Sequence, residues 1–216
     1  DIAAKEHYEP WPGGRVNHYY FDLNRDWAWT SQLESISRIK VYKRWMPHVH
    51  ADVHEQFKDN PYYFAPAAVP YHMHISDWQV EFQTRIGKNS ASQFDNKEWL
   101  YFTKEVFDLF YPSYGDTYPT FNGSIGMTYE QAGHSFSGRA VKMENGDTLT
   151  LQDRIDHHYT TSISTIEVSS EGAAELNSNF VKYFDVSSSN PPGALKSYII
   201  SGDNPAAELS DLAAYF

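Results

Sequence analysis

The chain has 216 residues, no cysteine, 41% hydrophobic residues and 16% aromatic residues. Its 17 Lys and Arg residues against 28 Asp and Glu residues give a formal net charge of −11. This composition predicts a folded domain and argues against a nucleic-acid-binding protein, because phosphate binding needs clustered basic residues. Without cysteine, a disulfide, a thiolate nucleophile and a cysteine-ligated zinc are excluded. No apolar run reaches the roughly 20 residues that a membrane-spanning helix requires.

Apolar spacing and helix-breaking residues predict the elements of the first half of the chain. Helical spacing predicts a helix over residues 30–46, which Pro47 ends. Alternation over the next eight residues predicts a short strand with His54 at its C-terminal end. Residues 60–70 contain three prolines and three aromatic rings and are predicted to form a loop held by ring packing. A second helix is predicted over residues 76–94.

The second half of the chain begins with a long loop rich in Tyr, Pro and Gly, residues 111–126. Ordered loops of this length are usually functional. A strand is predicted from Ile125, with Glu130 at its end. After a turn at Asn145-Gly146, Asp147 or Thr148 is predicted to cap a long helix.

That long helix is predicted to run toward Phe184, with interruptions near residues 160–164 and at Gly172, where poor helix formers occur. A linker of Ser, Asn, Pro and Gly follows, and a strand at 197–200 and a helix after Pro205 come next. The predicted domain organisation has three parts, which are residues 1–186 as one domain, residues 187–194 as a linker, and residues 195–216 as a tail or the start of a further domain. Alternating helices and strands favour an α/β fold with a mixed sheet and helices on both faces.

A set of polar residues at predicted loops and strand ends forms the best candidate site. Its members are Arg15, Asp22, Asn24, Arg25, His54 and Glu130. Sheets of α/β proteins build their binding sites at such positions. The histidine pairs at 48/50, 72/74 and 157/158 are interpreted as structural, because two histidines alone do not make a metal site.

The order of these residues resembles the zinc carboxypeptidase family of metallopeptidases. The most specific part is the block Asp22-Leu23-Asn24-Arg25-Asp26-Trp27, with Arg15 ahead of it and His54 and Glu130 after it. The resemblance extends from about residue 11 to residue 184 and implies the α/β/α fold of that family, here N-terminally incomplete.

The resemblance implies roles for the matching residues in binding and catalysis. Asn24 and Arg25 would bind the free carboxylate at the C-terminus of a substrate, since a planar guanidinium suits a carboxylate. Glu130 would take a proton from a zinc-bound water. Arg15 would stabilise the oxyanion, and Tyr118 would cap the bound substrate.

Some of these assignments leave alternatives open. Tyr114 is nearly as suitable as Tyr118 for the capping role, because the loop is short. The resemblance implies that His54 is the third protein ligand of a Zn²⁺ ion and that Asp22 holds the ring of another histidine ligand. Glu55 directly follows His54 and has no assigned role.

The chain departs from the family pattern in its zinc ligands. The family's first two ligands belong to a His-x-x-Glu motif before the Asn-Arg block, and none of the ten histidines here has Glu three positions later. A catalytic zinc site needs three protein ligands and an open position. We therefore expect a fragment of a Zn²⁺-dependent carboxypeptidase-like domain, inactive by itself. The alternative is a natural relative that has lost the metal.

The expected partner is a peptide or C-terminal amide substrate, with no nucleic acid and no membrane span. A non-catalytic binding module for a carboxylate-terminated peptide or a glycan-like ligand is the alternative function, suggested by 16 tyrosines and six tryptophans. Missing strands would leave sheet edges exposed, so self-association is expected. The sequence does not assign a compartment, and a secreted or periplasmic one is favoured.

Overall fold

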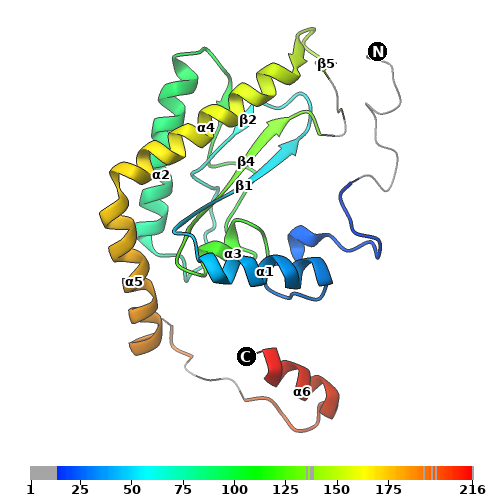
Figure 1. Cartoon of the computed structure of the whole chain (residues 1–216), viewed down its shortest axis with the longest axis vertical. Coiled ribbons are helices and arrows are strands. Elements are labelled where there is room, and N and C mark those ends of the chain that lie inside the picture. Colours follow the sequence, from blue (N-terminus) through cyan, green and yellow to red (C-terminus); the bar gives the residue numbers. More distant parts are fainter. Residues whose placement is uncertain are drawn as a thin grey trace. The chain divides into compact units, whose positions relative to one another are not determined.

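A computed structural model describes residues 14–134, 136, 139–191, 193–195, 197 and 199–215. Its packing separates a unit ending at Tyr183 from a unit comprising Phe184–Phe216. After a short 3₁₀ helix, Leu23–Arg25, the elements are α1 (Leu33–Trp45), β1 (Val49–Gln56), β2 (Tyr62–Tyr63), α2 (Asp77–Asp95), β3 (Tyr101–Phe102), α3 (Thr117–Thr120), β4 (Ile125–Ala132), β5 (Ala140–Lys142), β6 (Thr148–Thr150), α4 (Leu151–Glu171), α5 (Ala173–Ser189) and α6 (Ala206–Tyr215) (Figure 1).

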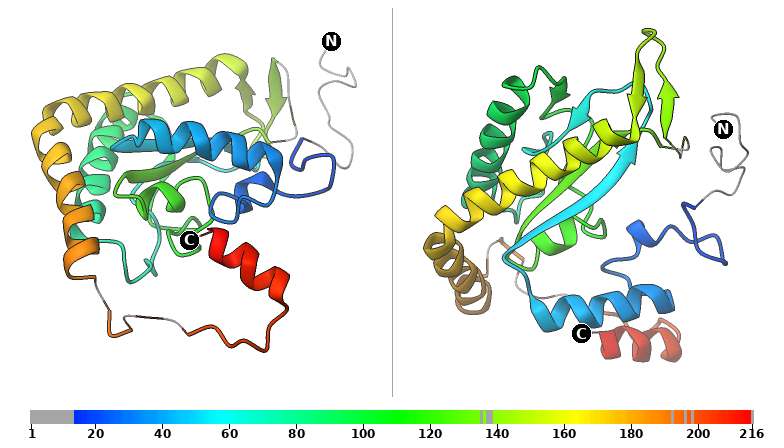
Figure 2. Two further views of the ribbon diagram at one scale, coloured as in Figure 1. Left: turned by 60° about the horizontal axis from the view of Figure 1, so that its bottom comes forward. Right: turned by 45° about the horizontal axis from the view of Figure 1, so that its top comes forward.

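The main sheet is mixed and has the strand order β1-β4-β2-β3. β1 and β4 are parallel, β2 is antiparallel to β4, and β3 is parallel to β2. Strands β5 and β6 form a separate antiparallel hairpin. Figure 2 shows β1 beside β4, with α4 running across them.

The register of β1 and β4 determines which side chains share a face. Asp52 pairs with Thr128, and His54 pairs with Glu130. Because successive residues of a strand point to opposite faces, these four side chains lie on the same face of the sheet. Two residues 76 positions apart, 130 minus 54, are thereby brought together.

The opposite face of the sheet carries the main hydrophobic core, which α2 and α4 cover. It includes Ile125, Met127 and Tyr129 of β4, Phe82 and Ile86 of α2, and Val168 of α4. These side chains are at most 8% exposed. Burial of several large apolar side chains here supplies the main driving force for folding.

Helix α1 packs on the face that carries His54. The ring of His50 in β1 lies 5.9 Å from the ring of Tyr42 in α1 and 5.4 Å from the ring of Trp27. Tyr118 packs on the same cluster. Helices therefore cover both faces of a mixed sheet, and the predicted fold class is confirmed.

The start of α4 differs from the prediction. Its N-cap is Thr150, whose side chain accepts a hydrogen bond from the Asp153 N–H in a capping box. Asp147 and Thr148 do not cap it, because Thr148 begins β6 directly after the turn at Gly146. The sequence pattern missed this hairpin because its strands have only three residues each.

Helix α4 also continues through residues 160–164, where an interruption was predicted. The hydroxyl of Thr161 lies 2.9 Å from the hydroxyl of Tyr62, and Ser164 accepts a hydrogen bond from Ser90. Tertiary contacts thus outweigh the low helix propensity of these residues. The predicted break at Gly172 is confirmed, since α4 ends one residue earlier.

The C-terminal elements agree with the sequence pattern only in part. α5 ends at Ser189 and includes the first three residues of the predicted linker. Ser197, Ile199 and Ile200 are not in a strand, and Tyr198 lies outside the described residues, as do Trp11 and the rest of 1–13. The helix predicted after Pro205 is present as α6. Every helix in the described ranges is too short or too polar to cross a lipid bilayer.

A half-buried histidine of α4, His158, is expected to make stability depend on pH. Burial lowers the pKa of His158 to about 4, from 6.5, and its Nδ1 lies 2.8 Å from the hydroxyl of Tyr62. The unfolded chain takes up this proton near pH 6.5, so the contribution of His158 to stability is complete above that pH. It is lost as the pH falls to about 4, and the loss amounts to about 3 kcal/mol.

Urea unfolding of the wild type and His158→Gln checks this expectation. Between about pH 7 and about pH 4, the variant should lose about 3 kcal/mol less stability than the wild type. The exposed His134 provides the control His134→Gln, which should follow the wild type. Identical pH profiles for all three proteins would contradict the expectation.

The outer edge of β1 predicts self-association. β1 is the terminal strand of the sheet order, and Val53 is 52% exposed on it. Unpaired apolar edge strands pair with other chains, and a lysine on the edge prevents this. In sedimentation equilibrium, Val53→Lys should weaken self-association about tenfold or more. Val181→Lys on α5, where Val181 is 60% exposed, should leave it unchanged; equal effects of both variants would rule out β1 as the contact.

Candidate active site

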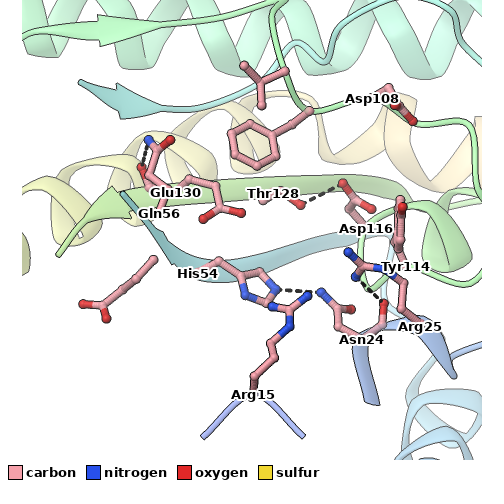
Figure 3. A pocket seen from close by; sticks show the side chains of 13 residues that line it. Arg15, Asn24, Arg25, His54, Gln56, Asp108, Tyr114, Asp116, Thr128 and Glu130 are labelled. Atoms are coloured by element: carbon pink, nitrogen blue, oxygen red, sulfur yellow. Dashed lines mark hydrogen bonds between the residues drawn. The ribbon is translucent and has the colours of Figure 1, made fainter. Parts of the chain in front are cut away.

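A pocket of about 400 Å³ opens on the face of the sheet that carries His54 and Glu130. Its lining includes Arg15, Asn24, Arg25, His54, Glu55, Asp108, Tyr114, Asp116, Thr128 and Glu130 (Figure 3). Six of the eight residues predicted for the site line this pocket, and they are Arg15, Asn24, Arg25, His54, Tyr114 and Glu130. Asp22 and Tyr118 are not among the lining residues.

The motif block begins with a capped 3₁₀ helix. Asp22 accepts a hydrogen bond from the Asn24 N–H through Oδ1 at 2.9 Å. Its Oδ2 accepts one from Nε of Arg15 at 2.9 Å. Asp22 therefore shapes the turn and holds Arg15, whereas the carboxylate that contacts His54 is Asp52.

The last two residues of the block, Asp26 and Trp27, connect it to the start of α1. Asp26 accepts hydrogen bonds from the N–H groups of Ser31 and Gln32, both at 2.9 Å. Burial alone would raise the pKa of Asp26, but hydrogen bonds from serine hydroxyls and from these backbone groups lower it. Trp27 is 6% exposed and packs against α1, so the motif is tied to the core.

The side-chain amide of Asn24 connects four parts of the site. Its Nδ2 donates to Oδ2 of Asp52 at 3.2 Å and lies 2.9 Å from Nε2 of His54. Its Oδ1 accepts from the indole N–H of Trp27 at 3.1 Å and from the Gly115 N–H at 2.8 Å. In this arrangement Asn24 positions its neighbours, and binding of a substrate carboxylate by Asn24 would have to replace one of these contacts.

His54 is held by a carboxylate from its own strand. Its Nε2 lies 2.7 Å from Oδ2 of Asp52. This hydrogen bond raises the pKa of His54, although burial opposes the shift. Burial would raise the pKa of Asp52, but the hydrogen bond and charge of His54 lower it. The remaining nitrogen, Nδ1, has no hydrogen bond to any described residue, which is the arrangement of a histidine whose second nitrogen is available to a ligand.

Glu130 has the properties of a proton acceptor. It is 8% exposed, and burial raises its pKa to about 7. The charges of Asp52 and Asp116 act in the same direction, and those of His54 and Arg15 oppose them. A carboxyl group with a pKa near neutrality can exchange protons efficiently at physiological pH.

Two arginines bring positive charge to the pocket. Arg15 pairs with Asp22 at 2.8 Å, and its side chain is 46% exposed. The guanidinium of Arg25 lies over the ring of Tyr114, 4.2 Å from the centroid, and donates to the Asn24 carbonyl at 3.1 Å. Tyr114 therefore supports a cation at the pocket, whereas Tyr118 lies in the aromatic cluster with Trp27.

Sequence reasoning missed three residues of the site, Asp52, Asp116 and Thr128. Asp52 could have been found, because it lies two positions before His54 in a predicted strand and so shares its face. Asp116 and Thr128 meet through a hydrogen bond of 2.7 Å between a loop and β4, which no local pattern indicates. Glu55, which was unassigned, forms an ion pair with Arg154.

The described residues do not complete a zinc site. His54, with Asp52 on one ring nitrogen, fits the role of a single ligand. Within the ranges that the structure describes, no group of three His, Cys, Asp or Glu side chains could hold a metal ion. A zinc site would therefore require ligands in addition to those described.

Comparisons with known proteins add one structural likeness. No protein-family model matches the chain, and no curated protein matches it. The crystal structure of a metallo-carboxypeptidase from Burkholderia cenocepacia is similar to it, with a TM-score of 0.46 and 13% sequence identity. The match covers 80% of this chain, which spans 40% of the length of that structure.

Proposed function

We propose that this chain carries part of the active site of a zinc-dependent carboxypeptidase-like hydrolase, which releases C-terminal residues from peptides. The observation that carries the proposal is the pairing of His54 with Glu130 across two parallel strands, in a pocket that also contains two arginines. The motif order in the sequence supports the same function.

Arg25 is the proposed ligand for the C-terminal carboxylate of the substrate. Its side chain is 45% exposed, and Tyr114 supports one face of the guanidinium. The guanidinium is planar and can donate two parallel hydrogen bonds to a carboxylate. Asn24 contributes by fixing the backbone and the side chains around Arg25.

Glu130 and Arg15 are the proposed groups for the chemical step. Glu130 takes a proton from the water that attacks the scissile carbonyl and passes it to the leaving amine. Arg15, paired with Asp22, donates hydrogen bonds to the developing oxyanion. Since the described residues contain no group of three side chains that could hold a metal ion, we expect this chain alone to show no zinc-dependent turnover.

Calorimetric titration with a peptide tests the carboxylate site independently of catalysis. A benzoyl dipeptide with a free carboxylate should bind, and the same dipeptide as its C-terminal amide should bind about 30-fold more weakly, or about 2 kcal/mol. Arg25→Gln should remove this difference. Arg44→Gln removes a charge from an exposed position of α1 and should bind like the wild type. Equal binding of acid and amide by the wild type would refute the proposed role of Arg25.

A non-catalytic binding module is the second candidate function. It is favoured by the absence of a three-ligand metal group among the described residues. It is also favoured by the ring of Tyr111, which lies 5.0 Å from the ring of the pocket residue Tyr114 and whose hydroxyl accepts a hydrogen bond from the indole N–H of Trp29 at 2.7 Å. Binding that is unchanged by a chelator, together with no hydrolysis in any longer form of the protein, would support this function. Zinc-dependent hydrolysis by a longer form would exclude it.

A further inference from the structure

We propose that Ser113 is a positioning residue for the carboxylate site, because its hydroxyl fastens the loop that carries Tyr114 to the backbone of Arg25. The inference rests on the proposed function, since it assumes that the substrate carboxylate lies at Arg25. It adds a residue that is not among those lining the pocket and on which the discrimination between a carboxylate and an amide depends.

Ser113 is fully buried and forms hydrogen bonds with the backbone of residues 25–28. Its hydroxyl donates to the Arg25 carbonyl at 2.8 Å and accepts from the Ala28 N–H at 2.9 Å. Its own carbonyl accepts from the Trp27 N–H at 3.3 Å. Since a hydroxyl has a single donor, the Arg25 carbonyl fixes its direction. Three hydrogen bonds of one residue therefore hold the loop against the end of the motif block.

The next residue, Tyr114, supports the guanidinium of Arg25. Its ring centroid lies 4.2 Å from the guanidinium carbon, and Figure 3 shows the two side chains next to each other. The Arg25 side chain is 45% exposed, and its ion pair with Asp22 is 3.8 Å long. A long exposed side chain loses conformational entropy when a ligand orders it. A ring that orders Arg25 in advance therefore strengthens binding, and the hydrogen bonds of Ser113 set the position of that ring.

Tyr111, on the other side of Ser113, provides a second contact between the loop and the block. Its ring lies 5.0 Å from the Tyr114 ring, and its hydroxyl accepts from the indole N–H of Trp29 at 2.7 Å. Trp29 is 55% exposed, so water can replace this hydrogen bond at little cost. The hydrogen bonds of the buried Ser113 hydroxyl are costlier to lose, and we expect them to determine where the loop lies.

Loss of the Ser113 hydroxyl would remove two of the hydrogen bonds between the loop and the block. Water that replaces a buried hydroxyl needs room between these two segments, so Tyr114 would move away from the guanidinium. A carboxylate depends on an ordered guanidinium, which donates two parallel hydrogen bonds to it, whereas an amide does not. The loss should therefore weaken binding of a peptide acid more than binding of its amide.

Titration calorimetry with the benzoyl dipeptide and its C-terminal amide measures this difference. The wild type should bind the acid about 30-fold more tightly than the amide, and Ser113→Ala should reduce this ratio at least threefold, to about ten or less. The matched control is Ser90→Ala, which removes another fully buried serine hydroxyl, one that donates to Ser164 where α2 packs against α4. The control should keep the ratio of about 30, even where it lowers stability.

The outcomes separate the role of Ser113 from the function on which it rests. Equal binding of acid and amide by the wild type would overturn the role of Arg25 and this inference together. A wild-type ratio near 30 that stays above about ten in Ser113→Ala would overturn the role of Ser113 alone. An equal fall of the ratio in Ser113→Ala and Ser90→Ala would also overturn it, because a general loss of rigidity would then explain both.

Hydrogen exchange in the wild type tests the same role without a substitution, should Ser113→Ala fail to fold. The Ala28 N–H donates to the Ser113 hydroxyl, and its exchange requires this hydrogen bond to open. At equal saturation, the acid should slow this exchange at least about threefold more than the amide, because only the acid engages the ordered Arg25. Equal slowing by the two peptides would overturn the role of Ser113.

Discussion

Glu130→Gln is expected to lower kcat for hydrolysis of the C-terminal peptide bond about 10³-fold in a zinc-loaded longer form of the protein. Glutamine has nearly the same shape as glutamate but cannot accept the proton of the attacking water. Because Glu130 shares its strand pair with His54 and does not contact Arg25 through any hydrogen bond or ion pair in the described structure, KM should change little. Steady-state kinetics that separate kcat from KM measure both expectations.

The control for this experiment is Glu171→Gln, which removes an exposed carboxylate at the end of α4. It should leave kcat and KM at their wild-type values. A Glu130→Gln enzyme that keeps more than about a tenth of the wild-type kcat would show that another group accepts the proton. A large rise in KM with unchanged kcat would instead place Glu130 in substrate binding.

The second large effect concerns stability and the close contact between β4 and the loop before α3. A Cβ at Gly126 would lie 1.9 Å from the carbonyl oxygen of Asp116 and 2.5 Å from Oγ1 of Thr120. Since backbone cannot move aside as a flexible side chain can, Gly126→Ala must displace the loop from the strand. We expect it to lower the free energy of unfolding by about 3 kcal/mol or more.

Urea unfolding measures this loss through the transition midpoint. Gly202→Ala is the matched control, because a Cβ there meets no atom within 4 Å. Its free energy of unfolding should stay within about 0.5 kcal/mol of the wild type. A Gly126→Ala protein that is destabilised by less than about 1 kcal/mol would show that the loop is not held as closely as the structure indicates.

The sequence predicted the parts of the fold that depend on the periodicity of apolar residues. Helix α2 begins after Ser76, where the predicted helix starts, and the strand predicted over residues 47–54 is present two residues further along, over Val49–Gln56. Six of the predicted site residues line the pocket, where the parallel pairing of β1 and β4 brings His54 beside Glu130, whereas Asp22 and Tyr118 are not in its lining. These features depend on local chemistry and on strand geometry.

Features that depend on tertiary contacts were not predicted. Helix α4 passes through Thr160, Thr161 and Ser164 because side chains of other elements bind their hydroxyls. The hydrogen bond between Asp116 and Thr128 joins a loop to a strand, and neither residue belongs to a recognisable motif. Local propensity cannot report an interaction whose partner is distant in the sequence.

The exchange rate of one backbone amide proton, that of Gly115, can report on the interior of the site, because this N–H is hydrogen-bonded to the side chain of Asn24. The Gly115 N–H donates to Oδ1 of Asn24 at 2.8 Å, and the same oxygen accepts the indole N–H of Trp27. Hydrogen exchange at Gly115 therefore reports each opening of the contacts that orient His54 and Arg25. Ligands that lock the pocket should slow this exchange, and substitutions in α1 that loosen Trp27 should accelerate it at a distance from the point of change.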